Sequence, residues 1–193
     1  MPMTYASLRL APIGLVGLLF ISPAGAAEDI WMLLKKPGHI ILLRHSNAPG
    51  NATERDDMDF KDCSQQRNLD AEGRAQAARI GDEFRKHKIR QVRLISSQYC
   101  RAVDTAKLTK LGPVTQNPAL NLVYLANPIA MRQAGEKGRE LLKKLPTGQL
   151  TIVVSHVTNI QAIGGGELAS GQMAVVHLDK SGAVVVDGTI TVP

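Results

Sequence analysis

The chain is 193 residues long, and 44% of its residues are hydrophobic while 21% are charged. These values are typical of globular proteins, and the length is sufficient for one domain with a well-buried core. The net charge of +6 favours anionic ligands only weakly, and the aromatic content of 4% is too low for the stacking surface of a nucleic-acid-binding protein. We therefore expect a single globular domain that binds no nucleic acid.

Residues 1–27 differ in composition from the rest of the chain. Arg9 precedes an apolar segment over 10–21, and small residues follow over 22–27 at the spacing of a signal-peptide cleavage site. The apolar segment is too short for an ordinary transmembrane helix. The pattern predicts a signal peptide over 1–27, one domain over 28–193, a periplasmic or secreted location, and no stable membrane insertion after leader removal. An uncleaved N-terminal anchor is the alternative.

The first half of the domain predicts two strands and two helices. An apolar run over 39–43 is expected to form a buried strand, and the polar segment over 46–68 a loop or lid. Asp70 is expected to cap a helix that continues to about residue 88. A strand over 92–96 follows, and the serines at its end are expected to cap a helix over about 98–111, which Gly112 and Pro113 stop.

The second half continues this alternation. A helix is expected over 128–145, and a strand over 151–155 leads into a short helix that starts near Thr158 and ends at the glycines of 164–166. Two closing strands over 173–178 and 183–190 flank Lys180-Ser181-Gly182, which is typical of a hairpin. The order of elements predicts an α/β fold with three α/β/α layers and a mostly parallel central sheet.

Three of the expected strands are followed by residues suited to bind phosphate. Arg44 and His45 end the first strand, Arg101 lies in the first turn of the helix after the second, and His156 follows the strand over 151–155. Because ligands of open α/β sheets bind beyond the carboxyl ends of the strands, these side chains are expected to meet in one pocket. Taken singly, such a histidine is usually a satisfied polar group and such an arginine usually faces solvent.

These residue types fit phosphoryl transfer. The reaction needs an in-line nucleophile and fixed positive charge around the equatorial oxygens. A neutral imidazole can be the nucleophile when its other nitrogen donates to a carbonyl or carboxylate, and guanidinium groups match phosphate oxygens. We expect no metal ion and no cofactor. A zinc site at His45 and His156 is disfavoured because Arg44 and Arg101 would repel the ion.

The motifs resemble those of the histidine phosphatase superfamily, also called phosphoglycerate mutase-like. Arg44-His45-Ser46 is similar to the family's Arg-His-Gly, residues 96–106 resemble its second arginine motif, and Val154-Ser155-His156 resembles its second histidine motif. The segment over 66–77 is similar to its first-helix signature. With two cysteines and a leader, the chain is most similar to the small secreted bacterial branch.

The resemblance implies the expected fold and a role for each matching residue. His45 becomes the phosphohistidine, while Arg44, Arg101 and His156 bind the phosphoryl group. The implied activity is that of a secreted phosphomonoester hydrolase, a phosphatase acting on a small-molecule or envelope-glycan phosphate ester. The alternative is a noncatalytic periplasmic binder of phosphorylated glycans or other anions. The sequence carries no signal for the substrate or the oligomeric state.

Several positions depart from the family pattern or leave alternatives open. Asn51 falls where many members place a phosphate-binding asparagine, with Asn47 as a local competitor. Ser46 replaces the family's glycine, Val157 stands where the acid phosphatase branch has aspartate, and residues 120–123 lack the glutamate of the mutase-like branch. The general acid is therefore unassigned. The candidates, each of which is otherwise a solvated surface carboxylate, are Glu54, Asp56, Asp57, Asp59, Asp62 and, more weakly, Glu136.

The sequence also gives expectations for the two cysteines and the three remaining histidines. Cys63 and Cys100 are predicted to form a disulfide, because an exported protein meets an oxidising compartment. Such a bond would stabilise the fold by roughly 4 kcal/mol on the chain-entropy model, less any strain. Two unconnected thiols are the alternative. The histidines outside these motifs are expected to be structural or exposed, namely His39, His87 and His177.

Overall fold

A computed structural model describes residues 30–50, 58–124 and 127–193. The signal peptide predicted over 1–27 therefore lies outside the described residues. A short helical segment over 30–33 opens the described part and is followed by the first strand. Within the described ranges, no helix combines the length and the hydrophobicity needed to cross a membrane.

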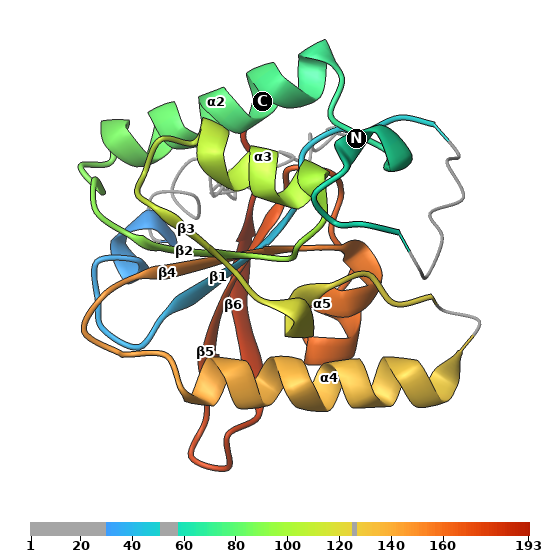
Figure 1. The fold of residues 1–193 in the computed structure, drawn as a ribbon. Coiled ribbons are helices and arrows are strands. Elements are labelled where there is room, and N and C mark those ends of the chain that lie inside the picture. Colours follow the sequence, from blue (N-terminus) through green and yellow to red (C-terminus); the bar gives the residue numbers. More distant parts are fainter. Residues whose placement is uncertain (1–29, 51–57, 125–126) are drawn as a thin grey trace, which may run out of the picture.

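The centre of the described structure is a six-stranded sheet with the order β3-β2-β4-β1-β5-β6 (Figure 1). The strands β1, β2, β3 and β4 run parallel, whereas β5 pairs antiparallel with β1 and β6 antiparallel with β5. The prediction of a mostly parallel sheet is confirmed. The bounds of the strands are β1 Ile40–Arg44, β2 Arg93–Ser96, β3 Val114–Gln116, β4 Thr151–Ser155, β5 Met173–Leu178 and β6 Val184–Ile190.

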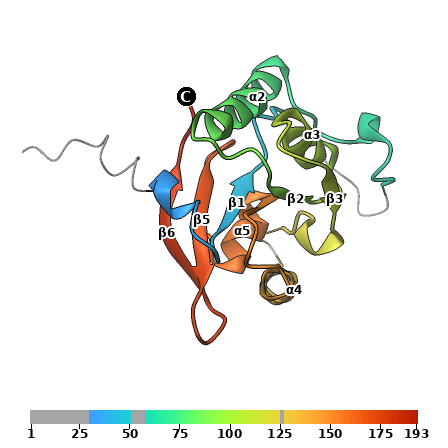
Figure 2. The same ribbon diagram turned by 90° about the vertical axis from the view of Figure 1, so that its left-hand side faces the viewer.

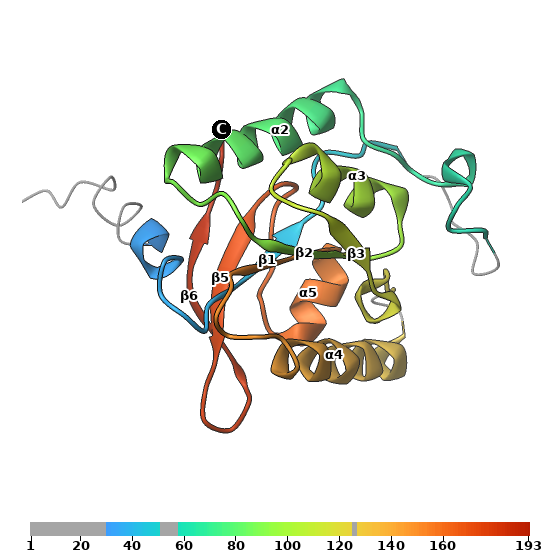
Figure 3. The ribbon, with the colours of Figure 1, turned by 60° about the vertical axis from the view of Figure 1, so that its left-hand side comes forward.

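Helices cover both faces of the sheet, as the three-layer prediction requires. α2 Ala71–Lys86 and α3 Cys100–Leu108 lie over one face, and α4 Pro128–Lys143 and α5 Val157–Ile163 lie over the other (Figures 2 and 3). Two short 3-10 helices, η1 Cys63–Gln65 and η2 Pro118–Leu120, occupy connecting segments. β3, η1 and η2 were not predicted, because three residues are too few to show a hydrophobic period.

The ends of the helices test the predicted caps. Asp70 caps α2 as expected, since its carboxylate accepts a hydrogen bond from the Gly73 N–H at 2.6 Å. Gly164 ends α5 in the left-handed region at φ 113°, which a residue without Cβ adopts at low cost. The prediction that serines cap α3 was wrong. Tyr99 is its N-cap and makes no side-chain cap hydrogen bond, and the shortest side-chain contact of the Ser97 hydroxyl is with His156.

The core consists of two layers separated by the sheet. Alternate residues of β1 point to opposite faces, so Ile41 and Leu43 join the cluster beneath α2 and α3, while Ile40 and Leu42 join the cluster beneath α4 and α5. β1 is buried on both faces, which explains why its sequence is a continuous apolar run rather than an alternating one. This double burial holds the end of β1, and therefore the residue that follows Arg44, in a fixed position.

Candidate active site

The carboxyl ends of β1, β2 and β4 bring two imidazoles and a guanidinium group into contact. The His45 N–H donates to the Ser155 carbonyl of β4 at 3.0 Å, which places His45 beside His156. Their ring centroids are 5.4 Å apart. The side chain of Arg101, from the first turn of α3, lies between them. Its Nε is 3.2 Å from His45 Nε2, and its Nη2 is 3.3 Å from His156 Nδ1.

The hydrogen bonds of His45 determine which ring nitrogen is free. His45 Nδ1 lies 2.8 Å from the Ser46 carbonyl oxygen, which can only accept, so Nδ1 carries the hydrogen. Nε2 then has a lone pair and accepts from Arg101. Burial, followed by the charge of Arg101, lowers the pKa of His45 to about 3. The imidazole is therefore neutral at physiological pH, with Nε2 as its nucleophilic nitrogen.

His156 has the opposite tautomer. A guanidinium group only donates, so His156 Nδ1 accepts from Arg101, and Nε2 carries the hydrogen and donates to Ser97 Oγ at 2.8 Å. Ser97 Oγ also accepts from the Tyr99 N–H at 3.3 Å, which fixes its lone pairs toward both donors. Burial, and then the charge of Arg101, hold the pKa of His156 well below its usual range. Both imidazoles thus direct a lone pair at the same guanidinium group.

Arg101 is completely buried, so the alternative of a solvent-facing arginine is wrong. Its guanidinium group stacks on the Tyr99 ring at 4.6 Å and donates to the Arg67 carbonyl at 3.4 Å. Thr105 Oγ1 donates to the Arg101 carbonyl at 2.7 Å and accepts from the Ser46 N–H at 3.0 Å. Through Thr105, the first turns of α3 are tied to the residue that follows His45.

Arg44 and Arg67 extend the positive charge of the pocket. Arg44 donates to the Leu168 carbonyl at 2.7 Å, and burial, with the nearby charge of Arg67, lowers its pKa, while Glu167 acts in the opposite direction. The charge of Arg67 also contributes to the lowered pKa values of both imidazoles. No role was predicted for Arg67. Its position in the 66–77 segment, just before the first helix, was the available signal.

Several candidate residues lie elsewhere or outside the described ranges. Asn47 donates to the Asp70 carboxylate at 2.9 Å and so holds the start of α2. Asp62 caps η1, and hydrogen bonds from Ser64 lower its pKa. Glu136 is exposed on α4. Outside the described residues are Asn51, Glu54, Asp56 and Asp57.

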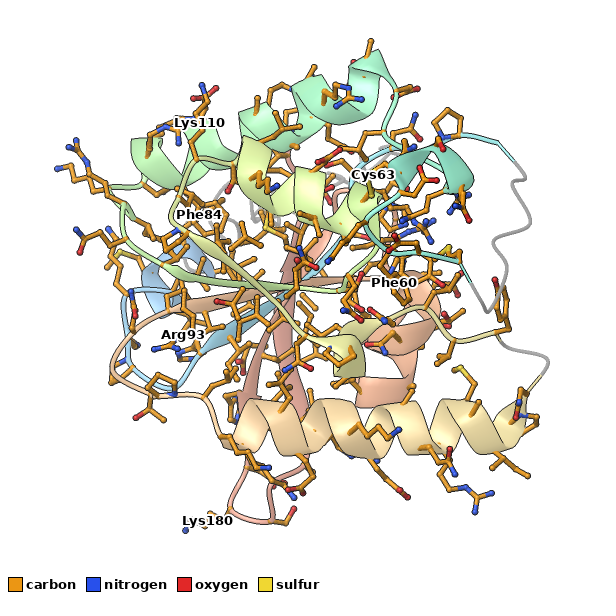
Figure 4. The ribbon with its side chains drawn as sticks, in the orientation of Figure 1. Phe60, Cys63, Phe84, Arg93, Lys110 and Lys180 are labelled. Atoms are coloured by element: carbon orange, nitrogen blue, oxygen red, sulfur yellow. A yellow bond between two sulfur atoms is a disulfide. The ribbon has the colours of Figure 1, made fainter. Side chains whose placement is uncertain are left out.

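The predicted disulfide between Cys63 and Cys100 is present, with 5.8 Å between the Cα atoms. It fastens the segment after β1 to the residue adjoining Arg101, and Cys63 and Phe60 lie at the same side of the molecule, by the start of α3 (Figure 4). A cavity of about 490 Å³ opens beside the disulfide. Its polar lining comes from Asp59, Lys61, Gln98, Asp104, Lys107 and Gln116.

Comparisons with known proteins agree with this geometry. Residues 40–121 match the model of the histidine phosphatase superfamily (branch 1), a range that runs from β1 to the residue after η2 and contains His45 and Arg101. No curated protein sequence is significantly similar to the chain. The match covers the first part of the domain, and His156 lies beyond it.

Solved structures share the fold at low sequence identity. The protein histidine phosphatase SixA complexed with tungstate is 18% identical with a TM-score of 0.56, and the match covers 79% of this chain and 96% of SixA. A phosphoserine phosphatase from Entamoeba histolytica in complex with phosphoserine is 14% identical at 0.57, covering 78% and 95%. A mycobacterial glucosyl-3-phosphoglycerate phosphatase in complex with VO3 is 16% identical at 0.59, covering 78% and 97%.

Proposed function

We propose that this chain is a phosphatase of the histidine phosphatase superfamily and that it hydrolyses phosphomonoesters through a covalent phosphohistidine on His45. One observation carries the proposal. His45 Nε2 is a neutral, unprotonated nitrogen that lies 3.2 Å from a buried guanidinium group. A nucleophile beside fixed positive charge is the arrangement that phosphoryl transfer needs.

The reaction has two displacements. His45 Nε2 attacks phosphorus, an N–P bond forms, and the bond to the ester oxygen breaks while that oxygen takes up a proton. Water then attacks the phosphohistidine, its proton passes to a base or to solvent, and release of phosphate restores the neutral imidazole. The Ser46 carbonyl keeps the hydrogen on Nδ1 throughout, so Nε2 stays available in both steps.

Arginines and His156 bind the phosphoryl oxygens in this proposal. Arg101 exchanges its contacts with the two imidazoles for contacts with the anion, and Arg44 and Arg67 add positive charge at the mouth of the site. A bound dianion offsets the burial and the arginine charge that hold the His156 pKa low, so His156 takes up a proton and becomes a second donor. The Ser46 hydroxyl, buried and without a partner among the described residues, is suited to donate as well.

Protonation of the leaving oxygen is assigned to a carboxylate. Glu167 lies next to the Leu168 carbonyl that binds Arg44, and its charge acts on Arg44. The aryloxide of an aryl phosphate is a good leaving group and needs no general acid. The alkoxide of an alkyl phosphate is a poor one, so loss of the general acid slows its hydrolysis by about 10²- to 10⁴-fold. We propose Glu167 as this acid, so Glu167→Gln should lose alkyl phosphate hydrolysis and keep aryl phosphate hydrolysis, while Glu136→Gln on α4 changes neither. Equal rates in all three proteins would exclude Glu167.

The covalent intermediate provides the decisive experiment. Wild-type protein quenched during turnover of a ³²P-labelled aryl phosphate is expected to carry acid-labile label on His45. His45→Ala should lose both label and turnover, and His87→Gln, at the far end of α2, should lose neither. Phosphate binding without turnover of any ester would instead identify a noncatalytic anion binder, which an inefficient or absent general acid would favour.

We further propose that the protein is exported and acts on an envelope sugar phosphate, as in the small secreted bacterial branch of the family. The leader pattern of residues 1–27 and the Cys63–Cys100 disulfide support export. N-terminal sequencing of the chain recovered from the periplasm should begin near Glu28. An intact leader on that protein would contradict export by cleavage.

A further inference from the structure

A second group of ligand-type side chains gathers at the opposite end of β1 from His45. His39 precedes β1, His177 lies on β5, and Asp187 lies on β6. One ligand atom from each residue lies within 4.8 Å of the other two. β1 separates His39 from His45 by five residues, or roughly 17 Å of strand, so the two sites do not share ligands.

The register of the sheet explains why these residues meet. Ile40 pairs with Val176 in the antiparallel β1–β5 ladder, which brings His39 opposite His177. On the other side of β5, Val176 pairs with Val186 while Val175 pairs with Gly188, so Asp187 is the extra residue of a β-bulge. A bulge redirects a side chain out of the regular ladder, and here it turns Asp187 toward both histidines.

The three side chains face one another over short distances. His39 Nδ1 is 3.4 Å from the Lys36 carbonyl oxygen, and the opposite ring nitrogen, Nε2, faces Asp187 Oδ2 at 3.7 Å. The second distance is too long for a hydrogen bond. His177 Nδ1 lies 2.9 Å from each of the two Asp187 oxygens, within hydrogen-bond range. His177 and Asp187 therefore form a pair that His39 faces without a hydrogen bond.

We propose that His39, His177 and Asp187 form a binding site for a divalent transition-metal ion of the Zn²⁺ type. Zn²⁺ binds imidazole nitrogen and carboxylate oxygen at about 2.0–2.2 Å, so the ligand atoms of a tetrahedral site lie roughly 3.4 Å apart. The observed separations are 3.7 Å for His39 Nε2 to Asp187 Oδ2 and 2.9 Å for His177 Nδ1 to the same oxygen, and small side-chain rotations equalise them.

The surroundings complete such a site. The His39 Nδ1–H on a backbone carbonyl is the outer-shell contact that orients many metal-bound histidines. The side chain of His177 is 38% exposed, which leaves access for a water molecule as fourth ligand. A bound ion would join the start of β1 to the β5–β6 hairpin and stabilise the edge of the sheet. Although no metal ion was expected from the sequence, the three ligands lie at positions 39, 177 and 187, a spacing that no short motif reveals.

Equilibrium titration of the chelator-stripped protein with Zn²⁺ tests the proposal, with Co²⁺ as a spectroscopic probe. Wild-type protein is expected to bind one tight equivalent, to show the intense visible absorption of tetrahedral Co²⁺, and to melt at a higher temperature with Zn²⁺ than without it. Removing an outer-shell contact of a metal ligand costs about 10- to 100-fold in affinity, so Asp187→Asn and His177→Ala, which remove a ligand, should cost at least that much.

Two controls separate the site from nonspecific binding and from misfolding. His87→Gln removes a histidine that contacts Glu83 at 3.1 Å, and it should leave the tight equivalent unchanged. The cluster variants should retain aryl phosphatase activity, which shows that they are folded. Equal Zn²⁺ affinity in wild type and Asp187→Asn would overturn the proposal, and so would wild-type binding as weak as that of the cluster variants.

Discussion

The two buried imidazoles predict a specific loss of stability in acid. An unfolded histidine titrates near pH 6.5, whereas burial and Arg101 hold the pKa of folded His45 at about 3. Between these values the unfolded chain binds a proton that the folded chain excludes, so stability falls as the pH falls. Each pH unit in that window costs about 1.4 kcal/mol for His45, which amounts to nearly 3 kcal/mol between pH 6 and pH 4.

Replacing His45 isolates this contribution from the other titrating groups. The free energy of unfolding of wild type and His45→Asn is measured by urea denaturation at several values between pH 4 and pH 7. The free energy of unfolding of the variant, relative to that of wild type, should rise by about 1.4 kcal/mol for each pH unit of acidification, since asparagine has no proton to exclude. Thr109→Val, which removes a buried hydroxyl hydrogen-bonded to the Ala106 carbonyl, should shift stability by a constant amount.

Phosphate provides an independent check of the same reasoning. A bound dianion opposes the burial and the arginine charge that depress the imidazole pKa values, so saturating phosphate should flatten the wild-type pH dependence below pH 6.5. If wild type and His45→Asn instead respond to pH in parallel in the absence of phosphate, the imidazole is not held neutral by the fold, and the nucleophile assignment loses its electrostatic basis.

Three further predictions concern the frame of the site. Arg101→Lys keeps the charge but loses the two directed contacts with the imidazoles, so kcat/KM for an aryl phosphate should fall about 10²- to 10³-fold, and an unchanged value would refute its role. Joint replacement of Cys63 and Cys100 by alanine should lower the free energy of unfolding by roughly 4 kcal/mol in denaturant titrations, whereas no change would show that the loop it closes is ordered without it. Gly73→Ala would place a Cβ against the Asn47 carbonyl oxygen and should lower Tm markedly, whereas Gly148→Ala, with nothing within 4 Å, should not. Equal melting temperatures of the two variants would contradict that close packing.

Some elements of the fold can be predicted from the sequence more accurately than others. β1, β4 and β5 are mostly apolar, and their predicted ranges differ from the observed ones by at most one residue. The cap of α3 was mispredicted because the Ser97 hydroxyl has two competing uses, as a helix cap and as a partner of His156, and only packing decides between them. β3 was missed because its three residues are defined by pairing with β2 rather than by their own pattern.

The site shows the same division. Arg44, His45, Arg101 and His156 could be selected because parallel strands deliver their following residues to one edge of a sheet. The protonation states of His45 and His156 could not be predicted from the sequence, since they depend on how completely α3 and the neighbouring segments exclude water from the two imidazole rings.

The layered α/β fold could be predicted from the sequence, because buried strands and amphipathic helices are local patterns that short-range sterics and hydrophobic periodicity impose. Three features could not be predicted in this way: the order of strands in the sheet, the tautomers of His45 and His156, and the proximity of His39, His177 and Asp187. They depend on contacts between residues that are far apart along the chain. Contacts between residues separated by tens of positions follow from strand register and mutual burial, and neither is encoded in the spacing of a single segment.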